Sequence, residues 1–150
     1  MTPRLLHAAN PGPMTGDGNW TYLIGDRNPV LIDAGVGQAS HLDAIAAVAP
    51  GGPSVVLVTH AHSDHVSGAP AIQSRWPGAR FMKFPWPSRT GHRDPGAGVA
   101  ELGWTWLEDG SIVATDEGPL TVLHTPGHAP DHLTFWHAGS RTLFVGDMLV

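Results

Sequence analysis

The stretch Ser54–Ala69, SVVLVTHAHSDHVSGA, decides how the rest of the sequence is interpreted. It opens with an apolar run, Val55–Val58, which is typical of a strand buried on both faces. After Thr59, three histidines and an aspartate follow within six residues: His60, His62, Asp64 and His65. Imidazole nitrogens and carboxylate oxygens are ligands that zinc and similar divalent ions accept. The stretch therefore predicts a metal site at the carboxyl end of a buried strand.

Length and composition place this site in one ordinary globular domain, residues 1–150. The chain has 150 residues, of which 41% are hydrophobic and 14% charged, and this suits a single core. A formal charge of -5 without any block of Lys or Arg argues against general electrostatic binding to nucleic acid or anionic membrane, although a local basic groove stays open. Because there is no cysteine, any metal must be held by histidines and carboxylates.

The N-terminus lacks the apolar core of a signal peptide, and no later apolar run is long enough to span a membrane. We therefore expect a soluble, cytoplasmic protein with no membrane partner.

Hydrophobic periodicity and turn residues predict an α/β layer. Strands are expected over residues 20–25, 30–33, 55–58, 80–83, 104–107, 112–114, 120–125, 133–136 and 142–145, and helices over 40–49 and from Gly68 to Arg75. The Pro- and Gly-rich segments 10–19 and 84–98 are expected to be loops. The first is either a plain connector or a lip over the site. In the second, Arg89, His92 and Arg93 could contact an anionic substrate, but we expect them to be solvated.

Two further apolar strands end in residues that bind metals. Residues 122–128 (VLHTPGH) end in a tight turn that presents His128, and residues 143–147 (LFVGD) end in Asp147. In open α/β sheets ligands gather at the carboxyl ends of strands. Three such ends are therefore expected to meet at one cleft.

Other polar residues have a structural and a functional interpretation. Asp33 ends an apolar strand, where we favour a turn-former slightly over a carboxylate that steadies the metal loop. His132 either orients the turn of His128 or lines the cleft, but we expect it at a strand edge. His124 is expected to pack within its strand. The remaining histidines are expected at the surface: His7, His41, His92 and His137. We expect Trp76, Trp86, Trp104 and Trp106 to pack in the core and loops rather than to stack on bases.

The motifs together resemble a known family. THAHSDH resembles the HxHxDH signature of the metallo-β-lactamase superfamily, and TPGHAPDH and GDMLV resemble its next two ligand segments, in the same order. Within that superfamily NPGPM, KFPWP and TPGHAPDHLTF most resemble the lactamase-β-like hydrolases near glyoxalase II and the lactamase-like endoribonuclease. The resemblance implies an αββα sandwich.

The resemblance also implies a site and an activity. His60, His62 and His128 would hold one metal ion, Asp64 and His65 a second, and Asp147 would bridge the two. Two zinc ions are expected, with iron or manganese as alternatives. The implied activity is a hydrolase whose metal-bound hydroxide attacks an ester, thioester, lactone or phosphodiester, with Asp64 as the catalytic residue that positions the nucleophile and carries a proton. The substrate would be a small molecule or RNA.

Two alternatives to this activity stay open. Family members continue beyond the Asp147 segment with a second half and a later histidine. We therefore expect a chain that lacks its C-terminal part, with uncovered apolar sheet surface, or a site that is mononuclear or completed by water or another chain. The protein could then bind metal and be catalytically impaired. The other alternative is a mononuclear iron sulfur dioxygenase that uses His60, His62 and His128.

Overall fold

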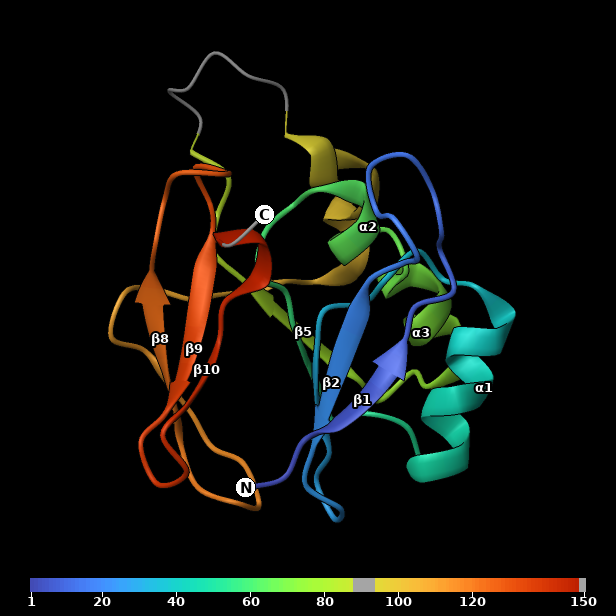
Figure 1. The fold of residues 1–150 in the computed structure, drawn as a ribbon, viewed down its shortest axis with the longest axis horizontal. Coiled ribbons are helices and arrows are strands. Elements are labelled where there is room, and N and C mark those ends of the chain that lie inside the picture. The colour runs from blue at the N-terminus through green and yellow to red at the C-terminus, as the bar shows by residue number, and fades with distance from the viewer. Residues whose placement is uncertain (88–93, 149–150) are drawn as a thin grey trace.

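Two β-sheets packed face to face form the frame of the protein (Figure 1). The computed structural model describes residues 1–87 and 94–148. The first sheet has the strand order β1-β2-β3-β4-β5-β6. Its strands are β1 (Arg4–His7), β2 (Trp20–Ile24), β3 (Val30–Ile32), β4 (Val55–Leu57), β5 (Arg80–Lys83) and β6 (Thr105–Trp106). The first three strands are antiparallel, whereas β3 to β6 run parallel.

The second sheet is antiparallel throughout and has the order β10-β9-β8-β7. Its strands are β7 (Ile112–Val113), β8 (Leu120–His124), β9 (Leu133–His137) and β10 (Thr142–Phe144). Inward-facing residues of both sheets, such as Leu57 and Phe135, form one apolar core between them. The outer face of this second sheet exposes Ile112 (63%) and Leu143 (44%).

Helices cover the other face of the first sheet (Figure 1). They are α1 (Ala39–Val48), α2 (Ser63–Val66), α3 (Ala69–Arg75) and the 3₁₀ helix η1 (Pro95–Leu102), whereas a second 3₁₀ helix, η2 (Gly146–Met148), follows β10 of the second sheet. A second core, which contains Ile45, Ile72 and Phe81, lies between these helices and the sheet. The layers are thus helix, sheet and sheet, which confirms the predicted α/β sandwich as far as its second sheet.

Most of the expected elements form, but four further elements were not expected: β1, α2, η1 and η2. Residues 4–7 were not expected to be a strand, yet β1 pairs with β2 along its whole length. The segment 84–98 was expected to be loop throughout, but η1 begins at Pro95, where the Asp94 side chain accepts a hydrogen bond from the Gly96 amide (2.7 Å). Arg89, His92 and Arg93 lie outside the described residues. Within the described residues no helix is long and apolar enough to cross a membrane.

Candidate metal centre

The HxHxDH segment begins where β4 ends, beside the carboxyl end of its parallel neighbour β3. The chain then runs through Thr59–His62 into the short helix α2. On the other side of the site, the turn between β8 and β9 presents His128, and η2 after β10 presents Asp147. A backbone hydrogen bond from Leu133 to Thr59 (2.7 Å) joins the two sheets at this level. The three predicted strand ends therefore meet, as the sequence indicates.

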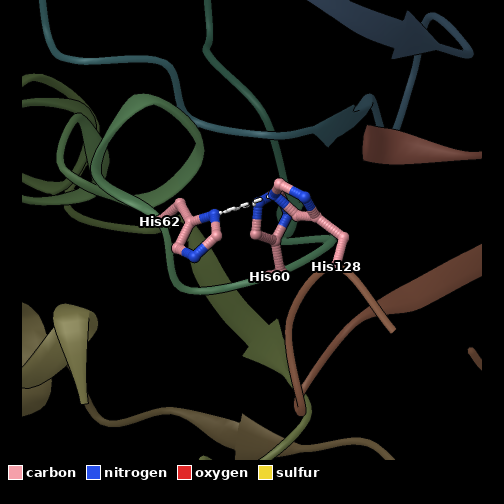
Figure 2. Close-up of side chains that lie close together, drawn as sticks. All are labelled: His60, His62 and His128. Carbon is pink, nitrogen blue, oxygen red and sulfur yellow. Dashed lines mark hydrogen bonds between the residues drawn. The ribbon is translucent and has the colours of Figure 1, made fainter. Parts of the chain in front are cut away.

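The imidazoles of His60, His62 and His128 converge on one point (Figure 2). His62 Nδ1 lies 3.0 Å from His60 Nε2 and 2.9 Å from His128 Nε2. Zinc–nitrogen bonds of about 2.0–2.1 Å at tetrahedral angles would separate such nitrogens by roughly 3.3 Å. A small outward movement of the rings would make room for an ion. This nitrogen set fits the first metal ion implied by the resemblance.

The protonation of these rings also suits a metal. Burial, followed by the neighbouring His65 and His62, holds the pKa of His60 far below its ordinary value. Burial and His128 lower the pKa of His62 as well. Both rings are therefore neutral near pH 7, and a neutral imidazole can offer a lone pair to a metal ion.

The second predicted set gathers around His65. Its Nε2 lies 3.3 Å from Asp64 Oδ2 and 3.2 Å from Asp147 Oδ1. Asp147 Oδ2 in turn lies 3.5 Å from His128 Nε2 and 3.9 Å from His60 Nε2, so this carboxylate stands between the two sets. Ligand atoms of His60, His65 and Asp147 also lie within 4.8 Å of one another, whereas Asp64 belongs to neither such group.

The charge around His65 favours a cation. Burial lowers the pKa of His65, but the carboxylates of Asp33, Asp147 and Asp64 outweigh burial and raise the pKa to about 12. Their contacts with His65 lower the pKa values of Asp64 and Asp147. Three carboxylates around one ring form a site for a positive charge, which either a proton on His65 or a divalent ion satisfies.

Asp33 corrects one expectation, because it is more than a turn-former. Its carboxylate is buried and accepts hydrogen bonds from the Thr59 amide (2.8 Å) and hydroxyl (3.0 Å). Its other oxygen lies 2.8 Å from His65 Nδ1. The contacts favour the functional interpretation: Asp33 fixes the start of the loop that carries His60 and His62, and it faces His65 Nδ1, so that Nε2 is the nitrogen turned toward Asp64 and Asp147.

Asn19 was not identified from the sequence, although it contacts a predicted ligand. Its Nδ2 donates to Asp64 Oδ2 (2.9 Å), while its own Oδ1 accepts from Asn10 Nδ2 (2.8 Å). Asn19 and Asp64 are 45 residues apart, and no spacing signal connects an asparagine in a turn-rich loop with a carboxylate on a distant helix. The loop 10–19 is thus tied to the site rather than being a plain connector.

Three histidines lie where the sequence did not place them. His132 is fully buried rather than at a strand edge, with Nδ1 3.0 Å from Thr125 Oγ1 and its ring 5.2 Å from that of His60. His41 and His137 are buried rather than at the surface, and each ring has a polar partner inside the protein. His41 Nε2 contacts Thr21 Oγ1 (2.8 Å), and His137 Nε2 contacts the Glu117 carbonyl (2.9 Å).

The aromatic expectations hold for His124, Trp76 and Trp104, whereas Trp106 on the edge strand β6 is exposed rather than packed. His124 stacks on Phe84, with ring centroids 4.0 Å apart. Trp76 and Trp104 pack against the helix-side core, while Trp106 is 55% exposed.

A cleft opens beside the first nitrogen set and has a volume of about 470 Å³. Its walls combine site residues with apolar groups of two loops: Met14, His62, Ser63, Asp64, Pro95, His128 and Asp147. Met14, at the tip of the loop 10–19, is almost fully exposed. A substrate in this cleft would contact ligand side chains on one side and apolar loop groups on the other.

Comparison with known proteins gives concordant results. A family model described as the metallo-beta-lactamase superfamily matches residues 14–150. The chain is 33% identical to an atrochrysone carboxyl ACP thioesterase of Aspergillus chevalieri, covering 98% of this chain and 46% of the relative. It is 33% identical to the beta-lactamase-like protein 2 homolog of Caenorhabditis elegans, covering 94% of this chain and 48% of the relative. The chain thus spans about half the length of these curated relatives.

A solved structure, TTHA1623 in a di-iron-bound form, superposes with a TM-score of 0.71 and 26% identity, covering all of this chain and 73% of that one.

Proposed function

The chain belongs to the metallo-beta-lactamase superfamily, and on that premise we propose that it forms the metal-binding part of a hydrolase with a water nucleophile. The observation that carries the proposal is the convergence of the His60, His62 and His128 nitrogens to within 4.8 Å of one another at the mouth of a cleft. The carboxylates of Asp64 and Asp147 beside His65 supply a place for a second ion.

A divalent ion held by these residues lowers the pKa of bound water and polarises a substrate oxygen. Side chains of the protein position the attacking water, take up its proton and hold the histidine rings. Asp64 borders the cleft, and the hydrogen bond from Asn19 fixes its orientation, so its carboxylate can hold the attacking water and take up a proton. Asp33 and Thr59 keep the His60 and His65 rings in place.

We propose an acyl substrate, an ester, lactone or thioester, ahead of a phosphodiester. Among the described residues, neither Lys nor Arg lines the cleft, whereas Met14 and Pro95 add apolar wall. An anionic diester gains most from cationic side chains, while an acyl chain gains from apolar contact. The relative from A. chevalieri is named as a thioesterase, which supports the same choice. The bound ions are proposed to be zinc, with iron as the alternative that the di-iron neighbour suggests.

Metal analysis and a substrate panel test the proposal. The purified protein is expected to contain zinc and to hydrolyse an acyl thioester or lactone faster than a phosphodiester or RNA. Asp64→Asn should retain the metal of the first set and lose at least about a hundredfold in rate. Protein that takes up neither zinc nor iron would refute the site, and equal rates for the wild type and Asp64→Asn would refute the role of Asp64. Iron in place of zinc would favour an oxygenase.

A further inference from the structure

A buried ion pair lies beneath the metal centre and takes no direct part in it. Lys83 Nζ is 4.0 Å from Asp131 Oδ2, and the two residues are only 2% and 1% exposed. Lysine and aspartate are almost never buried so completely, because removing their charges from water costs several kcal/mol per ion. Replacement by apolar residues of similar size often leaves such sites equally stable. Stability alone is therefore a weak reason for this pair.

Asp131 lies where the two loops that carry the first nitrogen set meet. It follows His128 by three residues in the turn before β9. Burial raises the pKa of Asp131 to about 6, while the ammonium of Lys83 and the backbone amides of Asp131 and Ala61 act in the opposite direction. Ala61 is the fully buried residue between His60 and His62. Within the described residues both Asp131 carboxylate oxygens are buried without a hydrogen-bond partner, so the Lys83 ammonium is the group that balances this charge in the turn of His128.

Lys83 is enclosed so that its ammonium faces this carboxylate. It ends β5, the strand beside β4, and its Nζ lies 5.7 Å from the ring centroid of Trp104 and 5.6 Å from that of Trp106. Gly96 of η1 closes the enclosure, since a Cβ at this position would lie 3.3 Å from Ala61 Cβ and 3.8 Å from Lys83 Nζ. Within the described residues Lys83 Nζ makes no hydrogen bond, and Asp131 is its ion-pair partner.

We propose that Lys83 and Asp131 are positioning residues of the metal centre. Their attraction draws the turn of His128 toward the end of β5, the strand that pairs with β4. The pair thereby sets the separation between His128 on the second sheet and His60 and His62 on the first. The inference rests on the proposed function, because a set distance between these nitrogens matters only if they share an ion.

Three variants test this proposal by the binding of Zn²⁺ alone. In Lys83→Met/Asp131→Leu both charges are replaced by apolar groups of similar size. We expect the metal-free double variant to unfold at a denaturant concentration close to that of the wild type, yet to bind Zn²⁺ about 10- to 100-fold more weakly in a chelator competition. Asp131→Asn, which keeps the shape of the side chain but not its charge, should also bind more weakly. Asp43→Asn is the matched control, because Asp43 pairs with Arg75 on the helical surface, and it should bind Zn²⁺ like the wild type.

The absorption spectrum of the Co²⁺-loaded proteins provides an independent readout. A displaced His128 should alter the d–d bands of the double variant, which a purely structural pair would leave unchanged. Wild-type Zn²⁺ affinity in the double variant would overturn the inference. If the double variant does not fold, wild-type affinity in Asp131→Asn overturns it instead. A wild-type protein that binds neither Zn²⁺ nor iron overturns the proposed function itself, so the two failures are distinguishable.

Discussion

Replacing Asp33 by Asn tests how the protein prepares His65 for a metal ion. The Asp33 carboxylate accepts from the Thr59 amide and hydroxyl through one oxygen and faces His65 Nδ1, 2.8 Å away, through the other. An asparagine has the same shape but only one acceptor oxygen. If that oxygen keeps the bond to the Thr59 amide, the new NH₂ group points at His65 Nδ1.

Two donors then face each other unless the His65 proton moves from Nδ1 to Nε2. Nε2 is the nitrogen that faces Asp64 and Asp147, and once protonated it cannot bind a metal ion. If the asparagine side chain rotates by 180°, its NH₂ group instead faces the Thr59 amide, which is also a donor. Loss of such a hydrogen-bond partner typically costs 10- to 100-fold in metal affinity, or about 1.4–2.7 kcal/mol. We expect a loss of this size at the second ion and a smaller loss at the first.

Stepwise Zn²⁺ titration against a chelator measures both affinities. Asp116→Asn is the matched control, because Asp116 also accepts from backbone amides, those of Arg27 and Asn28 (2.8 Å each), but lies away from the metal centre. It should leave both Zn²⁺ affinities unchanged. If Asp33→Asn binds the second ion as tightly as the wild type, the proton on Nδ1 does not prepare His65, and this account of Asp33 is refuted.

Three further predictions concern pH and metal. Because burial lowers the pKa of His41 to about 4, the unfolded chain gains this proton below about pH 6.5 before the native state does. Between pH 7 and 4 the free energy of unfolding should therefore fall by about 3 kcal/mol more in the wild type than in His41→Gln. Denaturant titrations at both pH values measure this fall, and an equal fall in the two proteins would contradict the prediction. Because neighbouring carboxylates raise the pKa of His65 to about 12, the second ion should displace about one proton at pH 7 and bind more tightly as pH rises; calorimetry that gives the same enthalpy in buffers of different ionisation enthalpy would disprove it. Zn²⁺ at about 100 times its dissociation constant should stabilise the protein by about 2.7 kcal/mol, and His60→Ala should abolish most of the accompanying rise in Tm.

Local patterns in the sequence predict those elements whose conformation is determined by residues close together in the chain. The run Val55–Val58 predicts β4 because an unbroken apolar segment suits a strand buried on both faces. The ligand segments after β4, β8 and β10 could be placed together because neighbouring strand ends share one edge of a layered fold. Family resemblance then assigned the ligands to two ions, an assignment that the nitrogen distances of the first set support.

The errors concern polar residues whose partners lie far away in the sequence. His41 sits in an amphipathic helix and gives no local sign of burial, because Thr21, its partner, lies on β2. Lys83 and Asp131, for which the sequence supports no prediction, become partners only when the sheets are stacked. Asp33 follows an apolar strand, as many turn residues do, and only the position of Thr59 just after the next parallel strand shows its role. In each case tertiary contacts decide the burial, and residue type alone does not.

The position of the predicted ligands would give a bound metal ion a structural role in addition to the chemical one proposed for it. His60 and His62 follow a strand of the first sheet, whereas His128 and Asp147 follow strands of the second. An ion bound to both groups therefore joins the two sheets at one edge, and the apolar core that contains Leu57 and Phe135 sets how far apart they lie. Any change that alters the separation of the sheets must alter the ligand distances as well. Packing between the sheets and metal affinity would consequently be coupled, which is the physical route by which the buried charge pair is proposed to act on a bound ion without touching it.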